Sequence, residues 1–449
     1  MNTSFNNKKT TKESPAKKRL YEVADIGALL GEKNDCVCGK LHTCDIKSVI
    51  IKHGALLELN SLCDGYNNLL LVCDTNTRRV CANDVEAILG NKIASEITFE
   101  CDGVLIPDED AVARIEALID EKTDLIIGVG SGVINDLCKH VSYRAKLPYY
   151  IVATAPSMDG YASKGAAMLF GGMKITTNAA VPTAIIADTA VLKNAPLEMI
   201  QAGYGDIIGK YSCLNDWRLS SLVNGEPLCP FIYDLTFNTV KQISEIGKSV
   251  LSRDEKSIEL LMNALIIVGI AMAYMGNSRP ASGSEHHLSH FFEVVGILKN
   301  EPYFCHGTDV AYSTYVTAML RKNLFGIDSP EGKTFSEENW EKELFRVYST
   351  DENDTVAKGV IETQRKLGWI YEDPFPVYKE KWNEIKEVLR DSPTPEEILS
   401  MLNDAGLKIE EFGSMYSKEK IADAIRYAKD LKDRYTVLWL YYEYFRSEV

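Results

Sequence analysis

The chain has 449 residues, of which 45% are hydrophobic and 25% charged, and its formal net charge at pH 7 is -15. This length exceeds that of one ordinary domain and predicts two. The acidic balance argues against nonspecific binding to nucleic acid or to an anionic membrane, so an anionic substrate would need a local basic pocket. The sequence shows no uninterrupted apolar run long enough to span a bilayer. We therefore expect neither a nucleic-acid partner nor a membrane partner.

The first 20 residues, MNTSFNNKKTTKESPAKKRL, are polar and basic and lack the apolar segment of a signal peptide. We expect residues 1–20 to form a disordered basic tail. The chain has 11 cysteines without a secretion signal, which predicts reduced thiols and a cytoplasmic location.

Residues 21–193 alternate short apolar runs with helical patterns. The predicted strands are SVIIKHGA, NLLLVCD, DLIIGVG, PYYIVAT and TAIIAD, and the helical stretches between them include DEDAVARIEALIDEK and SGVINDLCKHVSYRAK. This alternation is typical of βαβ units around a parallel sheet that is buried on both faces.

Residues 194–449 have a different character. APLEMIQAGYGDIIGKYSCLNDWRLSS and EKSIELLMNALIIVGIAMAYM have helical periodicity, and strand candidates are few. The sequence therefore predicts an α/β domain over 21–193, followed by an all-helical domain over 194–449.

A glycine loop follows the third predicted strand, in DLIIGVGSGVINDLCKH. Glycines let the backbone approach a phosphate closely, and N–H groups at the start of the next helix stabilise its charge. The spacing departs from the G-x-G-x-x-G fingerprint, so a tight turn without a ligand is the alternative. Asp74 ends the preceding strand, where a carboxylate can accept hydrogen bonds from a ribose diol. Together the two features favour a dinucleotide.

A second polar turn follows a strand in IVATAPSMDGYASKGAAM. Ligands bind at the carboxyl ends of strands in parallel sheets. The hydroxyls of Thr154, Ser157 and Ser163 suit a phosphate or a nicotinamide amide, and Asp159 suits a substrate hydroxyl. A simple helix cap is the alternative.

Four of the seven histidines lie in one stretch, SGSEHHLSHFFEVVGILKNEPYFCHG. His286 and His290 share a helix face, and His306 opens the next helical pattern. Two imidazoles and a carboxylate suit zinc or a similar transition ion. Asp206, in an apolar helical stretch, supplies a carboxylate whose burial is costly unless it is paired or bound to metal. For any single histidine, an ordinary hydrogen-bonded role is the alternative.

Five motifs, in this order, resemble those of the sn-glycerol-1-phosphate dehydrogenases, most closely the bacterial, AraM-like branch: GVGSGVIND, TAPSMDGYAS, GYGDIIGKY, RPASGSEHHLSH and CHG. That family belongs with the iron-containing alcohol dehydrogenases, glycerol dehydrogenases and dehydroquinate synthases. The resemblance covers about residues 45–320. It implies the dehydroquinate synthase-like fold, in which an α/β Rossmann-like N-terminal domain and an all-helical C-terminal domain enclose the site between them.

The resemblance also implies a role for each matching residue. The dinucleotide contacts would be Asp74, Gly130, Gly132, Val133, Ile134, Asn135, Asp136, Thr154, Ala155, Pro156, Ser157 and Ser163. The metal ligands would be Asp206, His286 and His306. The substrate would be contacted by Asp159, Asp206 and His290, of which Asp159 and His290 are the catalytic candidates. Arg279 and Lys210 are our candidates for the substrate phosphate, although either residue can equally be solvated or ion-paired.

The implied reaction is the reduction of dihydroxyacetone phosphate to sn-glycerol 1-phosphate by NADH or NADPH, with one divalent ion per chain, nickel or zinc. His290 or ordered water would supply the proton. Asp74 would repel a 2′-phosphate, which favours NADH. The resemblance further implies a homodimer and a role in glycerophospholipid synthesis. The alternatives are a glycerol or polyol dehydrogenase, a lyase of the dehydroquinate synthase type, and a noncatalytic scaffold protein.

One cluster lies outside these motifs. DCVCGKLHTC places Cys36, Cys38, His42 and Cys44 close together in sequence. A small metal or redox site is conceivable, but the C-x-C spacing is tighter than the usual C-x2-C of zinc knuckles. We therefore favour reduced thiols that bind no ion.

Overall fold

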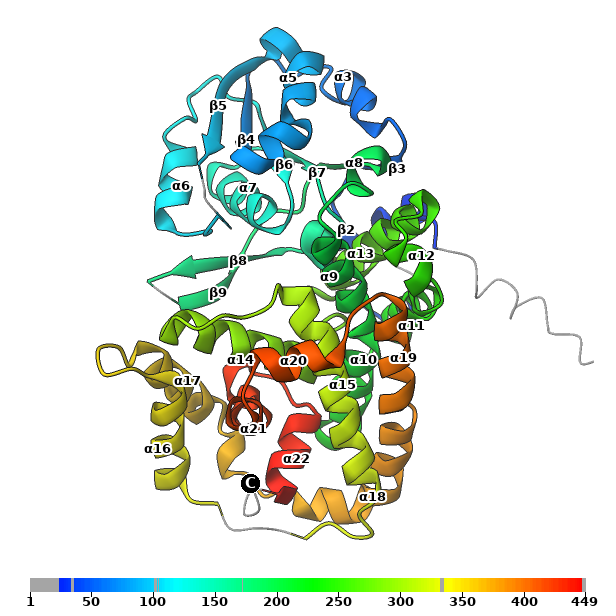
Figure 1. Ribbon diagram of the computed structural model, residues 1–449, viewed down its shortest axis with the longest axis vertical. Helices are drawn as coiled ribbons and strands as arrows, with labels where there is room; N and C mark the ends of the chain where they lie inside the picture. Colours follow the sequence, from blue (N-terminus) through cyan, green and yellow to red (C-terminus); the bar gives the residue numbers. More distant parts are fainter. Residues whose placement is uncertain are drawn as a thin grey trace, which may run out of the picture.

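The structure is a computed structural model that describes residues 24–33, 36–100, 103, 105–171, 173–331 and 335–445. The predicted basic tail, 1–20, lies outside the described residues. Figure 1 shows an upper part built on a sheet and a lower part built of helices. The predicted fold class is confirmed: a parallel sheet with flanking helices precedes a helical half.

The upper part contains a six-stranded parallel sheet with the strand order β3-β10-β7-β6-β4-β5. Its strands are β3 (Ser48–Lys52), β4 (Leu69–Asp74), β5 (Ile93–Phe99), β6 (Leu125–Gly130), β7 (Tyr149–Ala153) and β10 (Ala184–Asp188). All of them except β5 were predicted from apolar runs. At the sheet edge, β5 is largely exposed or half-buried along its length, so its sequence lacks a continuous apolar run.

Helices cover both faces of this sheet (Figure 1). Successive residues of β4 point to opposite faces of the sheet and enter two different cores. Leu70 belongs to the same core as Leu137, and Leu71 belongs to the other core, with Val85. Before residue 194, the helices are α2 (Ile26–Leu29), α3 (Leu59–Leu62), α4 (Thr75–Thr77), α5 (Asn83–Leu89), α6 (Glu109–Glu116), α7 (Gly132–Ala145) and α8 (Thr189–Leu192).

The order of the strands changes direction between β4 and β6. From β4 the chain proceeds outward to β5, and it then returns to β6 on the other side of β4 and continues to β7 and β10. Such a switch point, outside the carboxyl ends of the strands, is where open α/β sheets bind their ligands. Asp74 ends β4 and Gly130 ends β6, so both predicted nucleotide loops lie at this point.

From residue 194 onward, the described residues contain helices and no strand. The helices are α9 (Leu197–Ile208), α10 (Lys210–Asn224), α11 (Pro230–Ser244), α12 (Gly247–Leu251), α13 (Glu255–Met275), α14 (Ser284–Lys299), α15 (His306–Phe325), α16 (Glu337–Tyr348), α17 (Thr355–Leu367), α18 (Phe375–Arg390), α19 (Pro395–Asp404), α20 (Ile409–Met415), α21 (Lys418–Tyr427) and α22 (Val437–Phe445). The long apolar stretch that was predicted to be helical coincides with α13.

Two antiparallel hairpins lie outside the main sheet. The first, β1 (Gly31–Lys33) with β2 (His42–Cys44), packs against α13, so this N-terminal hairpin lies on the helical half. The Tyr274 hydroxyl of α13 donates a hydrogen bond to the Leu29 carbonyl of the same N-terminal segment. The second, β8 (Gly165–Phe170) with β9 (Met173–Asn178), projects between the two halves in Figure 1.

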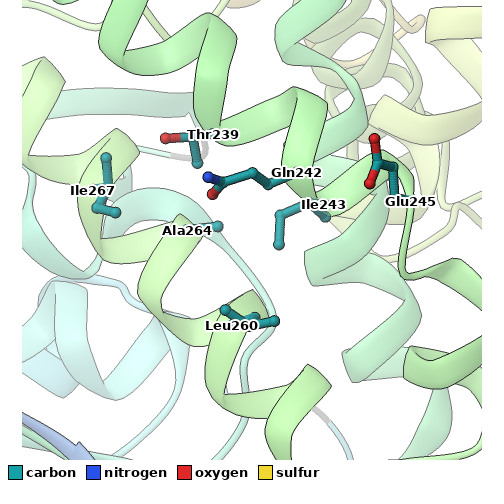
Figure 2. A pocket seen from close by; sticks show the side chains of 7 residues that line it. All are labelled: Thr239, Gln242, Ile243, Glu245, Leu260, Ala264 and Ile267. Carbon is teal, nitrogen blue, oxygen red and sulfur yellow. The ribbon is translucent and has the colours of Figure 1, made fainter. Parts of the chain in front are cut away.

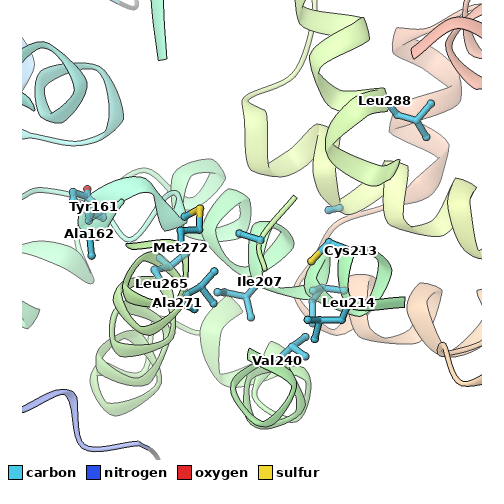
Figure 3. Packing of buried hydrophobic residues seen from close by; sticks show 14 of the residues in the cluster. Tyr161, Ala162, Ile207, Cys213, Leu214, Val240, Leu265, Ala271, Met272 and Leu288 are labelled. Carbon is cyan, nitrogen blue, oxygen red and sulfur yellow. The ribbon is translucent and has the colours of Figure 1, made fainter. Parts of the chain in front are cut away.

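The two halves also meet at the short 3-10 helix η4 (Asp159–Ala162), which follows β7 and packs against α13. Figure 3 shows Tyr161 and Ala162 of this turn beside Leu265 and Met272 of α13. The close approach depends on Gly269 of α13, because a Cβ there would lie 2.8 Å from the Asp159 carbonyl oxygen. One apolar core therefore continues from the sheet into the helical half.

Among the described residues, α13 is long and apolar enough to pass the length and composition test for a membrane span. However, 78% of its most apolar window is buried inside the protein, as expected for a core helix.

Candidate active site

Three predicted metal ligands lie together at the junction of three helices. Asp206 comes from α9, His286 from α14 and His306 from the first position of α15. One side-chain donor atom of each lies within 4.8 Å of those of the other two, and His286 Nε2 is 3.4 Å from Asp206 Oδ1. One carboxylate oxygen and two imidazole nitrogens at this separation suit a divalent transition ion.

Glycines allow α9 and α15 to cross closely enough to form this group. A Cβ on Gly205 would lie 2.6 Å from the Gly307 carbonyl oxygen, and a Cβ on Gly307 would lie 2.0 Å from the Ala202 carbonyl oxygen. These glycines neighbour Asp206 and His306 in sequence. Any larger residue would separate the two backbones and, with them, the two ligands.

Each histidine of the group is held by a second polar partner. His286 Nδ1 lies 2.7 Å from Glu285 Oε1, and because a carboxylate only accepts, Nδ1 carries a proton, while Nε2 faces Asp206. His306 Nδ1 lies 3.2 Å from the Ser289 hydroxyl, which also donates to the His306 carbonyl at 3.3 Å. Such outer partners fix the tautomer and the ring orientation of metal-binding histidines. Sequence analysis missed Glu285 and Ser289, although both lie next to predicted residues on α14.

A buried ion-pair network surrounds Asp206. Lys210 Nζ lies 2.8 Å from Asp206 Oδ1 and 2.6 Å from Asp159 Oδ2, and the backbone N–H of Asp159 donates to Asp206 Oδ2 at 2.9 Å. Burial alone would raise the pKa of Asp206, but Lys210 and His286 hold it well below its ordinary value. Burial, together with the neighbouring Asp206, raises the pKa of Asp159. Lys210 therefore compensates two buried carboxylates at once.

His290 lies one helical turn after His286 on α14. Its ring centroid is 6.3 Å from that of His286 and 5.4 Å from that of His306. The structure thus brings the predicted substrate-contacting histidine to the edge of the cluster of Asp206, His286 and His306, called the metal group below. Its side chain is partly exposed there.

The glycine loop joins β6 to α7 at the switch point. A Cβ on Gly130 would lie 2.5 Å from Ile134 Cβ, and a Cβ on Gly128 would lie 2.8 Å from Cys138 Sγ. These two glycines thus let α7 pack directly on the strand. Gly132, by contrast, has ordinary room for a Cβ, 3.7 Å from Met158 Cγ. Val133 is partly exposed and Ile134 is buried.

Asp74 ends β4 and caps the short helix α4. Its Oδ1 accepts hydrogen bonds from the backbone N–H groups of Asn76 and Thr77, both at 2.8 Å. Asp74 therefore has a structural role as a helix cap. A ribose would have to use the other oxygen, Oδ2.

The polar residues of the second turn form an internal network with Lys139 of α7. The Lys139 ammonium donates to Ser163 Oγ at 3.0 Å and to the Gly165 carbonyl at 3.1 Å, and it lies 3.6 Å from Asp136 Oδ1. Asp136 Oδ2 accepts from the Ala167 N–H. Sequence analysis missed Lys139. Its role can be recognised only when the turn after β7 is known to pack against α7.

The remaining predicted nucleotide residues line the same region. Thr154 N–H donates to the Gly130 carbonyl at 3.1 Å, and the Ala155 carbonyl accepts from Tyr161 at 2.7 Å. Asn135 is buried, and its side-chain Nδ2 has no hydrogen-bond partner among the described residues. Pro156 is buried, and Ser157 is partly exposed.

A short chain of contacts connects the nucleotide loop to the metal group. Gly132 lies against Met158, the next residue is Asp159, and the Asp159 N–H bonds to Asp206. The switch point of the sheet and the predicted metal ligands therefore belong to one region of the molecule.

Arg279 is not brought to this region. Its buried guanidinium donates to the carbonyl oxygens of Asp216 and Tyr435, at 2.9 and 3.2 Å, and pairs with Glu226 at 3.0 Å. These partners belong to the helical core, so the geometry supports a structural role.

A separate cavity of about 170 Å³ lies between α11 and α13 (Figure 2). It is lined by Thr239, Gln242, Ile243, Glu245, Leu260, Ala264 and Ile267. None of the predicted site residues lines it.

Comparisons with known proteins agree with this architecture. The family model described as iron-containing alcohol dehydrogenase matches residues 49–196. Among solved structures, an iron-containing alcohol dehydrogenase from Thermococcus thioreducens has a TM-score of 0.56 at 16% identity, covering 91% of this chain and all of that one. A sulfoacetaldehyde reductase from Bifidobacterium kashiwanohense, solved with NAD+, has the same TM-score at 13% identity, covering 91% of this chain and 99% of that one.

Curated relatives are more similar in sequence. A glycerol-1-phosphate dehydrogenase (NAD(P)+) of Halalkalibacterium halodurans is 34% identical over 297 residues, which are 65% of this chain and 74% of that protein. A protein of the same name from Methanosarcina barkeri is 34% identical over 253 residues, covering 56% and 70% of the two chains. These matches confirm the resemblance and the class of enzyme predicted from the motifs: the chain belongs to the family of glycerol-1-phosphate dehydrogenases.

Proposed function

We propose that this protein reduces dihydroxyacetone phosphate to sn-glycerol 1-phosphate with hydride from a nicotinamide dinucleotide. The observation that carries the proposal is the contact between the two predicted sites. Asp159, which follows the nucleotide-side strand β7, donates its backbone N–H to the metal-side residue Asp206 at 2.9 Å. A dinucleotide at the switch point and a substrate beside the histidines would therefore be neighbours.

We propose Asp206, His286 and His306 as the ligands of one divalent ion, nickel or zinc. The donor set fits, because the three donor atoms converge and both imidazoles have outer hydrogen-bond partners that orient them. Such an ion, when bound, supplies Lewis-acid stabilisation of negative charge on a substrate oxygen. The protein contributes the position of the ligands and the compensation of their charge by Lys210.

The nucleotide residues are proposed to be those around the ends of β4, β6 and β7. Helix α7 begins at Gly132 and directs its N-terminus at this edge, which suits a pyrophosphate. Asp74 is the proposed ribose ligand, through Oδ2, and its charge disfavours the 2′-phosphate of NADPH. We therefore expect NADH to be the better donor.

His290 is proposed to contact the substrate and to deliver the proton, directly or through water. It lies beside both imidazoles of the metal group and is partly exposed, as a group that exchanges protons with solvent must be. Asp159, which is paired with Lys210, is proposed to hold a substrate hydroxyl.

A polyol dehydrogenase with an uncharged substrate is a second candidate. It is favoured by the placement of the two predicted phosphate-binding cations. Arg279 contacts the helical core, and Lys210 is already paired with two aspartates. The substrate phosphate, if present, would need another cation or the N–H groups of a loop.

A steady-state assay separates these functions. The apoprotein is loaded with nickel or with zinc and supplied with NADH or NADPH and dihydroxyacetone phosphate, and the product is analysed by chiral chromatography. Formation of sn-glycerol 1-phosphate supports the proposal. Oxidation of unphosphorylated glycerol with NAD+, without activity on the phosphate ester, supports the polyol enzyme. Release of inorganic phosphate with no net change in nicotinamide absorbance would indicate a lyase.

We also propose a cytoplasmic homodimer as the working form. Sedimentation equilibrium of the full chain at assay concentrations tests the oligomeric state, and a single species with the mass of one chain would contradict it.

A further inference from the structure

A second group of metal-binding side chains lies where the N-terminal hairpin meets the helical half. Cys36 and Cys38 come from the turn between β1 and β2, His42 is the first residue of β2, and Cys229 is the N-cap of α11. One donor atom from each of these four lies within 4.8 Å of the other three. The ligands come from two segments that are 187 residues apart.

The separations match those of a tetrahedral zinc site. Cys36 Sγ is 3.5 Å from Cys229 Sγ, and His42 Nε2 is 3.3 Å from Cys38 Sγ and 3.6 Å from Cys229 Sγ. Bonds of roughly 2.3 Å to sulfur and 2.0–2.1 Å to nitrogen place neighbouring ligands of a tetrahedron roughly 3.6–3.8 Å apart. The four donors thus lie close to where a bound ion would require them, with a small expansion.

The imidazole is oriented for such an ion. His42 Nδ1 lies 3.1 Å from the carbonyl oxygen of Tyr274, which can only accept, so Nδ1 carries the proton. The lone pair of Nε2 is then on the side of the sulfurs. His42 is 1% exposed and packs against the rings of Phe231 and Tyr274, with centroid distances of 6.4 and 5.6 Å. A backbone carbonyl on the second nitrogen is the usual arrangement for a metal-binding histidine.

The turn explains how a C-x-C pair can serve. Gly39 has φ 72°, a conformation that favours glycine, and its N–H donates to the Cys36 carbonyl at 2.9 Å. This turn directs Cys36 and Cys38 to the same side. Sequence analysis weighed only the local residues and included Cys44. In the structure Cys44 is instead a buried residue of the core, and the fourth ligand is the distant Cys229.

We propose that Cys36, Cys38, His42 and Cys229 bind a structural Zn²⁺ ion that fastens the N-terminal hairpin to α11 and α13. The protein supplies all four positions of a tetrahedron, so no place remains for a substrate, and the site is structural. It contains three sulfurs, whereas the Asp206 group contains none, so the two sites differ in chemistry and can be distinguished by spectroscopy.

The test uses the full chain, purified without chelators. The zinc content of the wild type and of Cys229→Ser is measured by inductively coupled plasma mass spectrometry. The protein is also prepared with Co²⁺, because thiolate ligands give cobalt a charge-transfer band that an Asp/His/His site cannot give. We expect the band in the wild type and in His286→Ala, and its loss, with the loss of one zinc per chain, in Cys229→Ser.

The matched control is Cys44→Ser, which removes a buried cysteine from the same strand as His42 but outside the set. We expect it to keep both the band and the zinc. If Cys229→Ser does not fold, the cobalt spectrum of the wild type decides by itself. A wild type without the charge-transfer band overturns the proposal, as does a Cys36–Cys229 disulfide found by peptide mapping of the purified protein.

Discussion

The buried carboxylate of Glu285 accepts a hydrogen bond at 2.7 Å from Nδ1 of the adjacent His286. The pair explains why an acidic residue is tolerated with 0% exposure: Glu285 also accepts from the Gly283 N–H at 2.9 Å. Its negative charge makes the imidazole a stronger ligand. We predict that Glu285→Gln, which keeps the shape and removes the charge, weakens metal binding by about 10–100-fold.

Competition with a chromophoric chelator measures this affinity, and circular dichroism checks the fold. Glu259→Gln, the same substitution on the exposed side of α13, is the control and should leave metal affinity unchanged. Equal metal affinities of the wild type and Glu285→Gln would contradict a role of the Glu285 charge in metal binding.

His286→Ala removes one proposed metal ligand without touching the sheet. We predict a loss of roughly 10²–10³-fold in kcat/KM, comparable to removing an electrostatic stabiliser from an active site. Dinucleotide binding, followed by NADH fluorescence, should stay within a factor of about two, because the switch point lies on the other half of the molecule. His53→Ala removes an exposed histidine that pairs with Glu255 instead, and it should keep full activity. Turnover by His286→Ala, or by rigorously chelated wild type, at the normal rate would contradict the metal mechanism.

Helix α9 approaches the nucleotide side through Gly203. A Cβ at this position would lie 1.8 Å from the Pro156 carbonyl oxygen, so Gly203→Ala must displace either α9 or the turn after β7. We predict destabilisation of about 1–3 kcal/mol from overpacking and a decrease in kcat, because Asp206 moves with the helix.

Urea unfolding and steady-state kinetics test this prediction. Gly359→Ala in α17 is the matched control, since a Cβ there meets nothing within 4 Å. It should stabilise the protein by about 0.5–1 kcal/mol through helix propensity. An active, fully stable Gly203→Ala would show that the crossing tolerates a methyl group.

Glu255, at the start of α13, connects the helical half to the sheet half. It pairs with Lys193 at 2.7 Å, accepts from the Thr189 hydroxyl at 2.7 Å and contacts His53 at 2.8 Å. The Lys193 bond, followed by those of Thr189 and His53, lowers the pKa of Glu255 from 4.5 to about 2. Because the folded pKa is the lower one, the stabilisation is present above pH 4.5 and is lost as pH falls towards 2.

We therefore predict that Glu255→Gln is less stable than the wild type at neutral pH and that the difference shrinks as the pH falls through this window. Urea unfolding of both proteins at a series of pH values measures the difference. Since Glu255 is partly exposed, high salt should reduce it. A pH-independent difference would assign the effect to shape and not to charge.

The parallel sheet could be predicted because its inner strands are buried on both faces and so appear as continuous apolar runs. Edge strand β5 has no such run. Strand β8 has an apolar sequence, but it pairs with β9 outside the main sheet, and the position of this hairpin depends on tertiary contacts. Likewise, the helix α13 was evident from an apolar stretch that no exposed helix would carry.

The site residues that could be predicted were those with a recognisable local sequence pattern. The histidines of α14 were noticed because helical spacing places His286 and His290 on one face, and Asp206 because an isolated acid is conspicuous in an apolar helix. The outer partner Glu285 looked like any other acidic residue. The distant Cys229 gave no signal, since nothing local connects it with Cys36. For Arg279 the sequence left two roles open, a contact with the substrate phosphate or an ordinary ion pair, and the fold directs its guanidinium to carbonyl oxygens of the core.

Because the N-terminal hairpin lies on the helical half, the described part of the chain passes between the two halves at residues 45–47 and again at 193–196. The strands that adjoin these passages, β3 and β10, are paired neighbours at one edge of the sheet. The two passages therefore lie on the same side of the sheet, where both could act as hinge segments. Any swing of the sheet about them would move β5, at the far edge, the most, and would carry the loops of β4 and β6 towards or away from the histidines by a smaller amount.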